Sequence, residues 1–432
     1  MEIKTLAELQ EPDARTLRFT PHGLGIGVQM TPEGAAQFQQ ECVAGLELAA
    51  AVADGTRQSF EHLRAVFAHG IMCYEIFTLV GDHALLVIEQ ALRDRFLEWH
   101  HGTLILIDLV GAEHSFSVTD YEDVIKLIRK HAKWKLRLSP GRGIAFNGML
   151  NGLYGWARGV GLLRGHRNRG QEKALTALRN FVAHANGYHL HGPVEAVRTL
   201  SDVAEIINQL WGVATPGGRL YPAPLRREVI ATVWDDDGKA QDTGLARDLN
   251  HEADVPGWTC VVLRAYFRPE ELRADPGLRE YDSWYEATRF PADLLWGPGP
   301  VSEAARWVAE HDPQPDECDY LDRVFVVQED NGRLFLPMRP SVAAALPAEM
   351  QAGTWRAMRC DHADAAWNHA RNLVTGRGCS DADDICVACL VENLRTGALA
   401  DVLGSIGPAA ADLPPSISTP WANPRSKEIS EL

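Results

Sequence analysis

The segment from Ala177 to His184 contains three side chains that could do chemistry together. Arg179 and His184 are separated by four residues, and Asn180 directly follows the arginine. A guanidinium can hold an anion through paired hydrogen bonds, and an imidazole can accept or donate a proton near neutral pH. These residue types could therefore bind an anionic substrate and move a proton on it.

The Arg-x4-His spacing alone is not specific. Five such pairs occur in the chain, whereas roughly one is expected by chance. Only the pair of Arg179 and His184 has Asn, Asp or His directly after the arginine. The other four pairs are Arg57/His62, Arg64/His69, Arg95/His100 and Arg306/His311.

The motif also lies next to a strongly basic segment, Lys126–Lys173. This segment has twelve Lys or Arg residues against one acid, Glu172, which gives a net charge of +11 in 48 residues and leaves −27 for the rest of the chain. The overall net charge of −16 argues against nucleic-acid binding through the whole surface. A locally basic segment suggests one anionic ligand held at one place, and a solvated helical face with acidic neighbours is the alternative.

A helix expected over residues 171–186 would carry the motif. At about 100° per residue, Asn180 and His184 lie one turn apart, and Arg179 flanks them about 140° around the helix from His184. Gly187 would end this helix. We expect an apolar face on the other side, formed by Ala174, Leu175, Leu178, Phe181, Val182 and Ala185.

Residues 33–212 have the periodicity of a mainly helical domain. A β-hairpin is expected between the third and fourth helices, with strands at 103–109 and 115–118. A second, α+β domain follows at 213–406, with strands expected at 229–234 and 260–267 and an Asn-Gly hairpin joining 324–327 to 333–336. Residues 1–32 form an N-terminal segment, and the proline-rich residues 407–432 are expected to be a mobile tail. Helices are expected at about 33–52, 58–80, 82–100, 120–137, 145–164, 171–186 and 194–211.

The sequence Arg179-Asn180-x-x-x-His184 resembles the R-polar-x-x-x-H signature of HEPN domains, the helical bundles of many prokaryotic toxin and antiviral ribonucleases. The order of elements is similar too, with the motif near the end of the penultimate helix and one more amphipathic helix closing the bundle. The resemblance covers roughly residues 33–212. It implies a HEPN-like bundle that usually works as a dimer with the two motifs facing each other.

The resemblance implies RNA cleavage without a metal ion. The ribose 2′-OH would attack the adjacent phosphodiester to give a 2′,3′-cyclic phosphate and a 5′-hydroxyl. His184 would act as acid or base, Arg179 would hold the non-bridging oxygens, and Asn180 would orient the histidine or the phosphate. No cofactor and no metal are expected. The residues expected to bind RNA are Arg158, Arg164, Arg167, Arg169 and Lys173.

Other readings of the helical domain stay open. HEPN bundles without nuclease activity exist, so the domain could be a nucleotide-binding or assembly module, with function in the C-terminal domain. Glu89 and Arg93 are an ordinary intrahelical ion pair unless their helix lines the active groove, in which case they could position substrate. His189 and His191 are expected to be solvent-facing loop histidines.

Cys386-Val-Ala-Cys389 is a short chelating pair, and a zinc-dependent binding protein organised by it is a third hypothesis. Against zinc, residues 385–394 have the pattern of an apolar helical face that would bury both thiols, and a second well-spaced pair is missing. We therefore expect no metal there, and we expect the acidic run at 381–384 to start a helix. The other residues that could join such a site are Cys379, His369, His362 and Cys360.

Composition limits the class of protein. The chain has 432 residues, 46% of them hydrophobic and 23% charged, which suits a globular protein of two or three domains. No run approaches the roughly 20 apolar residues that span a bilayer, and the N-terminus lacks the order of a signal peptide. Eight scattered cysteines do not resemble the disulfide framework of a secreted protein. These features predict a cytoplasmic protein that does not enter membranes.

The sequence therefore predicts a mainly α fold: a HEPN-like bundle with a small β-hairpin insertion, followed by an α+β domain. The predicted function is a homodimeric, metal-independent endoribonuclease that serves as a toxin or antiphage effector. The C-terminal domain would sense a trigger, bind a partner such as an antitoxin, or select the RNA.

Overall fold

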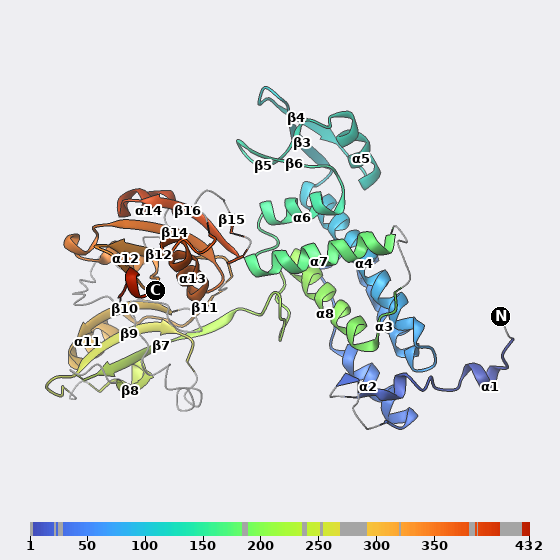
Figure 1. Cartoon of the computed structure of the whole chain (residues 1–432), viewed down its shortest axis with the longest axis horizontal. Coiled ribbons are helices and arrows are strands. Elements are labelled where there is room, and N and C mark those ends of the chain that lie inside the picture. The colour runs from blue at the N-terminus through green and yellow to red at the C-terminus, as the bar shows by residue number, and fades with distance from the viewer. Residues whose placement is uncertain are drawn as a thin grey trace. The chain divides into compact units, whose positions relative to one another are not determined.

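The structure is a computed structural model of the whole chain (Figure 1). It describes residues 3–20, 23–24, 29–183, 189–235, 240–250, 254–267, 292–318, 321–379, 385–386, 388–406 and 426–432. The chain divides into two compact units. The helical unit comprises residues 1–164 and 168–223, and the C-terminal unit comprises residues 165–167 and 224–432.

The helical unit is built around one long helix, α4 (Glu75–His100), which packs against α3 (Asp54–Ala68), α6 (Leu150–Gly159) and α8 (Pro193–Leu210). Because α4 has neighbours on several sides, its buried residues are not confined to one stripe. Pro193 occupies the first turn of α8, where its missing N–H is not needed. The unit also contains α7 (His166–Ala183) from Asn168 onward, together with α1 (Leu6–Leu9), α2 (Pro32–Ala44), η1 (Thr16–Arg18), η2 (His69–Ile71), β1 (Phe19–Thr20) and β2 (Gly23–Leu24).

A four-stranded antiparallel sheet lies between α4 and α6 in sequence. Its strand order is β4-β3-β5-β6, and α5 (Tyr121–Lys130) connects β4 to β5. The expected hairpin is present, but the helix expected to reach residue 137 ends at Lys130, because alternating charged and apolar residues from Lys135 onward place Leu136 in the core as part of a third strand. The strands are β3 (Thr103–Ile107), β4 (Glu113–Ser117), β5 (Lys135–Ser139) and β6 (Arg142–Ala145).

The C-terminal unit contains two antiparallel sheets. The first has the order β10-β9-β7-β11, with β8 also paired to β7, and the second has the order β15-β16-β14-β12-β13-β17. Asn331 and Gly332 both have positive φ in the turn between β12 and β13, as the expected Asn-Gly hairpin requires. The strands are β7 (Leu225–Trp234), β8 (Ala240–Leu245), β9 (Thr259–Ala265), β10 (Ala292–Gly299), β11 (Asp316–Cys318), β12 (Arg323–Asp330), β13 (Arg333–Phe335), β14 (Thr354–Cys360), β15 (Ile385–Cys386), β16 (Val391–Gly397) and β17 (Ser426–Glu428).

Helices and sheets alternate in layers in this unit. One core joins the facing sides of both sheets with α12 (Pro340–Ala345) and α14 (Leu399–Ile406). The outer face of the first sheet is covered by α11 (Val301–His311), and that of the second by α13 (Ala363–Val374). This layering places α13 on β12 and β14, close to β16. The short helices η3 (Ala246–Asp248), η4 (Ala348–Met350) and η6 (Ile429–Glu431) complete the unit.

The prediction of a mainly α fold is wrong, because the chain has an α+β fold with sheets in both units. The break expected near Gly81 is also misplaced. The chain turns earlier, between α3 and α4, where a side chain on Gly70 would collide with the ring of Phe77. Residues 426–432, expected to belong to the mobile tail, pair with β13 as β17 and continue into η6, whereas 407–425 lie outside the described residues. No described helix is long and apolar enough to cross a membrane.

Candidate functional site

Arg179 lies on α7 and is held by a buried carboxylate of α4. Glu89, whose side chain is 9% exposed, forms an ion pair with Arg179 and a second one with Arg93, one turn further along α4. Arg179 Nη1 also donates a hydrogen bond of 3.2 Å to Asn180 Oδ1. Glu89 and Arg93 are thus more than an intrahelical pair, because they connect α4 to the arginine of the motif.

The two arginines retain hydrogen-bonding capacity that Glu89 does not use. The Nε atoms of Arg179 and Arg93 are buried, and neither has a hydrogen-bond partner within the described part of the chain. Two guanidinium groups on one carboxylate also leave a net charge of +1 at a partly desolvated position. A buried N–H donor without an acceptor is costly, so this position favours an anionic acceptor.

A second polar cluster lies two turns earlier on the same face of α4. Asp82 Oδ1 lies 2.8 Å from His189 Nε2 and 3.8 Å from His191 Nε2, and the two imidazole centroids are 4.9 Å apart. Both histidines are about three-quarters buried, with 26% and 24% of the side chain exposed, so they differ from the solvent-facing residues we expected. The loop is tied to α4 by a hydrogen bond of 2.9 Å from His191 N to Thr78 Oγ1.

The end of α7 connects the two clusters. Asp82 and Glu89 are seven residues apart on α4, which corresponds to about 10 Å along the helix axis. Phe181, two residues after Arg179, makes an edge-to-face contact with His189, with ring centroids 5.3 Å apart. The motif histidine, His184, lies outside the described residues.

The buried face of α7 is not the face that we expected. Leu175 is buried, but Ala174 is exposed, Leu178 is 43% exposed and Phe181 is 36% exposed. Val182 is partly buried, and Ala185 lies outside the described residues. The interior positions of this helix are instead mostly polar and hydrogen-bonded: Asn168, Glu172 and Thr176.

The residues expected to bind RNA fall into different environments. Arg158 is buried and makes two hydrogen bonds to Glu172, of 2.6 and 2.7 Å, while the Tyr221 hydroxyl donates to the same carboxylate. Such an environment favours a structural role for Arg158. In contrast, Lys173 is exposed, and Arg164 and Arg169 are partly exposed.

A pocket of about 390 Å³ lies between α6 and α7. Arg169 and Lys173 contribute two cationic side chains to its wall, beside the Arg158–Glu172 pair. Arg167 belongs to the C-terminal unit, where it lines a different pocket together with Asp361 and His362.

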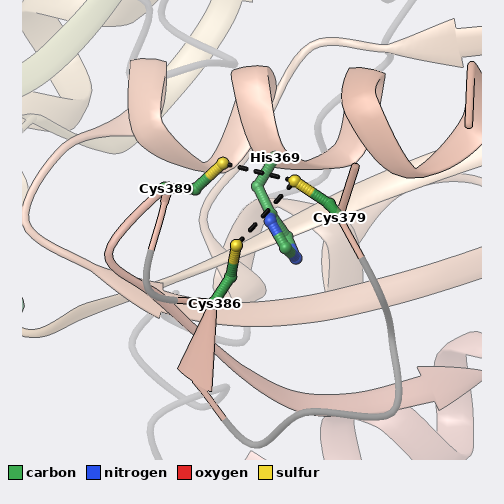
Figure 2. A group of neighbouring side chains, drawn as sticks. All are labelled: His369, Cys379, Cys386 and Cys389. Atoms are coloured by element: carbon green, nitrogen blue, oxygen red, sulfur yellow. Dashed lines mark hydrogen bonds between the residues drawn. The ribbon is translucent and has the colours of Figure 1, made fainter. Parts of the chain in front are cut away.

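The C-terminal unit contains a cluster of three cysteines and one histidine that we expected not to form a site. His369 lies on α13, Cys379 follows that helix, Cys386 lies on β15, and Cys389 lies in the turn to β16. The potential ligand atoms all lie within 4.8 Å of one another. Figure 2 shows the three sulfur atoms and the imidazole turned toward the same small space.

The other two residues weighed as zinc partners do not join this cluster. Cys360 is fully buried in the core under α13, where burial raises the pKa of its thiol to about 12. His362 lines the pocket that contains Arg167. Sequence reasoning named His369 and Cys379 among four possible partners of the Cys-x-x-Cys pair, but it expected no metal site, because these two residues are ten positions apart and form no recognisable chelating pair.

The Cys386–Cys389 turn places hydrogen-bond donors around the sulfur atoms. Leu390 N donates 2.8 Å to Cys386 O, and Leu390 has a positive φ of 55°, which closes the chain tightly between β15 and β16. Burial raises the pKa of Cys386, but hydrogen bonds from the backbone N–H groups of Cys389 and Ala388 outweigh it, so the net pKa shift is downward. Burial and the neighbouring thiols of Cys379 and Cys386 raise the pKa of Cys389 to about 12. Asn372 Nδ2 lies 3.9 Å from Cys389 Sγ as a further donor.

Two clusters are therefore the main candidates for function within the described ranges. One is the Arg179–Glu89 site with its neighbouring histidines, and the other is the cysteine and histidine cluster. Comparisons with protein-family models, with curated proteins and with solved structures find no match to this chain.

Proposed function

We propose that the helical unit is an endoribonuclease that cleaves RNA without a metal ion. The observation that carries the proposal is the arrangement of Arg179 and Arg93 on the buried carboxylate of Glu89, with an Nε–H of each left without an acceptor among the described residues. A phosphate oxygen is an acceptor of the right charge for both. The scissile phosphate would bind at the exposed parts of these two side chains, which are 23% exposed for Arg179 and 44% exposed for Arg93.

The reaction needs one proton acceptor, one proton donor and cationic stabilisation. The ribose 2′-OH loses its proton to a base and attacks phosphorus, and the bond to the 5′-oxygen breaks as that oxygen receives a proton from an acid. Arg179 stabilises the charge that develops on the non-bridging oxygens. Asn180, which accepts a hydrogen bond from Arg179, helps to orient it.

Two histidines would share the proton transfers. His184 takes one role by its place in the motif. We assign the other to His189, because Asp82 binds one ring nitrogen at 2.8 Å and so fixes the tautomer and the ring orientation. The products are a 2′,3′-cyclic phosphate and a 5′-hydroxyl.

The RNA strand would extend along α7 from the scissile phosphate toward Lys173 and Arg169. Both cationic side chains project from the same helix as Arg179 and line the pocket against α6. Lys173 is exposed and forms no ion pair within the described part of the chain, so it can meet a phosphate without losing one there.

A homodimer would place the exposed apolar side chains of this region in an interface. Leu178 and Phe181 on α7, and Leu79 and Leu86 on α4, are between 36% and 64% exposed beside the arginine site. Exposed apolar groups mark an interaction surface where they form one contiguous patch, and these four would do so in the proposed dimer. A Leu178→Glu variant should shift the protein from dimer to monomer in light scattering, and an unchanged mass would contradict this interface.

A catalytically silent nucleotide-binding module is the second candidate function. The pocket of about 390 Å³ between α6 and α7 has the size of a small-ligand site, and Arg169 and Lys173 supply charges that suit a nucleotide phosphate. This function requires Arg169 and Lys173 but neither His184 nor His189.

RNA cleavage by the purified full-length protein in EDTA tests the main proposal. We expect Arg179→Ala to lower the cleavage rate by about 10²- to 10³-fold and His184→Ala by about 10²- to 10⁴-fold. His62→Ala is the matched control, because His62 belongs to the Arg57/His62 pair and is exposed on α3. Product ends without a cyclic phosphate, or equal cleavage by all variants, would contradict the mechanism.

Expression in cells tests the role as a toxin or antiphage effector. Wild-type protein should arrest growth, and Arg179→Ala and His184→Ala should relieve the arrest at equal protein levels. If wild-type and variant proteins arrest growth equally, or if none of them arrests growth even in phage-infected cells, the nucleotide-binding module becomes the better supported of the two candidate functions.

A further inference from the structure

We propose that the C-terminal unit binds one zinc ion through His369, Cys379, Cys386 and Cys389. This site is independent of the proposed nuclease site, since every ligand belongs to the C-terminal unit. Three thiolates and one imidazole form a ligand set that zinc prefers. The inference rests on the geometry of the four side chains and on the groups that surround them.

The distances between the sulfur atoms fit a tetrahedral metal ion. Two sulfur atoms at ~2.3 Å from a tetrahedral zinc lie about 3.8 Å from each other, and a sulfur and an imidazole nitrogen lie about 3.5 Å apart. The distance is 3.5 Å from Cys379 Sγ to Cys389 Sγ and 3.8 Å from Cys379 Sγ to Cys386 Sγ. A disulfide would require about 2.05 Å. The cluster therefore has the spacing of a metal site and not that of a disulfide.

Packing and strand pairing hold three of the four ligands in place. The apolar core under α13 fixes this helix against the second sheet, which places His369, fully buried, beside the edge strand β15. The pairing of β15 with β16 fixes Cys386, which is 8% exposed, and the tight turn that follows it directs Cys389 back toward the helix.

Hydrogen-bond donors around the sulfur atoms suit thiolates. Backbone N–H groups of Ala388 and Cys389 point at Cys386, and the Asn372 amide points at Cys389. Three thiolates on one Zn²⁺ leave a net charge of −1, and such donors stabilise that charge in a buried place.

The hydrogen bond of His369 selects the nitrogen that would bind the metal. Nε2 lies 3.0 Å from Asn393 Oδ1, and because an amide oxygen can only accept, Nε2 must donate. The neutral ring then carries its lone pair on Nδ1. Ligating histidines typically donate their other N–H to an oxygen in this way, and the contact fixes the ring for coordination.

Four protein ligands make this a structural zinc site. A catalytic zinc keeps one position open for water or substrate, whereas three cysteines and one histidine complete the tetrahedron. The ion would connect α13 to the β15–β16 hairpin at the edge of the second sheet. Ala388, Cys389 and Leu390 also line the pocket that contains Arg167 and Asp361, so the ion would hold one wall of that pocket in place.

Elemental analysis of the full-length protein, purified without chelator, tests the proposal. We expect close to one zinc ion per chain. Cys386→Ser and Cys389→Ser should lose it, whereas Cys73→Ser, which changes an exposed cysteine of the helical unit, should keep it. Zinc that stays bound in both cluster variants, or protein with no zinc that also fails to bind added zinc, would overturn the proposal.

Three further measurements keep the test valid if the cysteine variants fold poorly. Cobalt exchanged into wild-type protein should give the intense visible bands and sulfur-to-cobalt charge transfer of a tetrahedral thiolate site, and the weak spectrum of octahedral cobalt would overturn it. Asn393→Ala should weaken zinc affinity by about 10- to 100-fold while the ligands remain. A mass lower by two hydrogens, which indicates a disulfide between cluster cysteines, would also overturn the proposal.

Discussion

The polar site of the helical unit and the cysteine cluster of the C-terminal unit both contain histidine, but their donors are arranged differently. Arg179 is 23% exposed, so a ligand that arrives from solvent can reach part of its side chain, and its buried Nε–H lacks an acceptor within the described residues. The four side chains of the cysteine cluster face one another around a fully buried imidazole. The first arrangement suits a transient substrate, and the second suits an ion that stays.

Burial of a histidine does not by itself indicate a site. His100 at the end of α4 packs on Phe96, with ring centroids 4.4 Å apart, and near Trp156. Burial, followed by the charge of Arg137, lowers the pKa of His100 to about 4, so the ring is neutral at physiological pH. His369 is buried too, but its neighbours are three thiols and an amide oxygen. The neighbours and not the burial separate a core histidine from a ligand.

Zinc removal should have the largest effect on stability, and the loss of stability should be confined to the C-terminal unit. Loss of a structural metal is among the few changes that cost more than about 4 kcal/mol of unfolding free energy. Hydrogen exchange after treatment with a strong chelator should therefore show loss of protection in β14 and β16, with α4 and α8 unchanged. Equal loss in both units would show that the two clusters are not independent.

Arg158→Ala should destabilise the helical unit by about 3–5 kcal/mol, because it leaves the buried Glu172 carboxylate without its cationic partner. Denaturant unfolding measures this cost, with Lys173→Ala as the control that should change stability by less than about 0.5 kcal/mol. If Arg158→Ala left stability intact and weakened RNA binding, Arg158 would return to the RNA-binding surface and the pair would not be structural.

Elements with strong local signals could be predicted from the sequence. The helix expected at 194–211 and the Asn331-Gly332 turn are local patterns, and the structure confirms both, with α8 at Pro193–Leu210. The strand β5 could not be predicted as easily, because a helical period and a strand alternation overlap around residue 135, and only pairing of Leu136 with Leu106 in β3 decides between them.

Prediction of the candidate sites from the sequence is limited in the same way, by contacts that form only in the folded chain. The orientation of α7 depends on Glu172, a carboxylate that the sequence places on a polar face but that Arg158 and Tyr221 satisfy in the interior. Glu89 was visible as one half of an i, i+4 pair, but its contact with Arg179 joins residues ninety positions apart. Long-range partners of this kind depend on tertiary packing, which no local pattern reports.

Glu89→Gln should lower RNA cleavage by about 10- to 100-fold, or about 1.4–2.7 kcal/mol of transition-state stabilisation. The amide keeps the shape of the side chain but removes the charge that holds Arg179 and Arg93 together. Glu61→Gln is the matched control, because Glu61 forms an exposed ion pair with Arg64 on α3, and surface pairs contribute little. Single-turnover cleavage compares the two, and equal rates would mean that Glu89 does not position Arg179.

The smallest expected effect is that of Lys173→Ala on the salt dependence of RNA affinity. It tests whether RNA contacts a defined site on α7 or is attracted by the basic segment as a whole. Each phosphate contact contributes about one to the slope of log affinity against log salt, so Lys173→Ala should reduce the slope by about 1. Lys126 is the matched control, because it belongs to the same basic segment but forms an ion pair of 3.2 Å with Glu122 on α5. Filter binding of an uncleavable RNA over a range of salt concentrations measures both variants.

If Lys126→Ala lowered the slope of log affinity against log salt as much as Lys173→Ala, RNA binding would depend on the total charge of the basic segment and not on a contact at Lys173. A change confined to Lys173→Ala would place the contact on α7, the helix of the arginine proposed to bind the scissile phosphate. Because Lys173 is exposed and far from the cysteine cluster in sequence, its loss should leave zinc content unchanged. Parallel loss of zinc would therefore contradict the separation of an open, ligand-binding site from a closed, structural one.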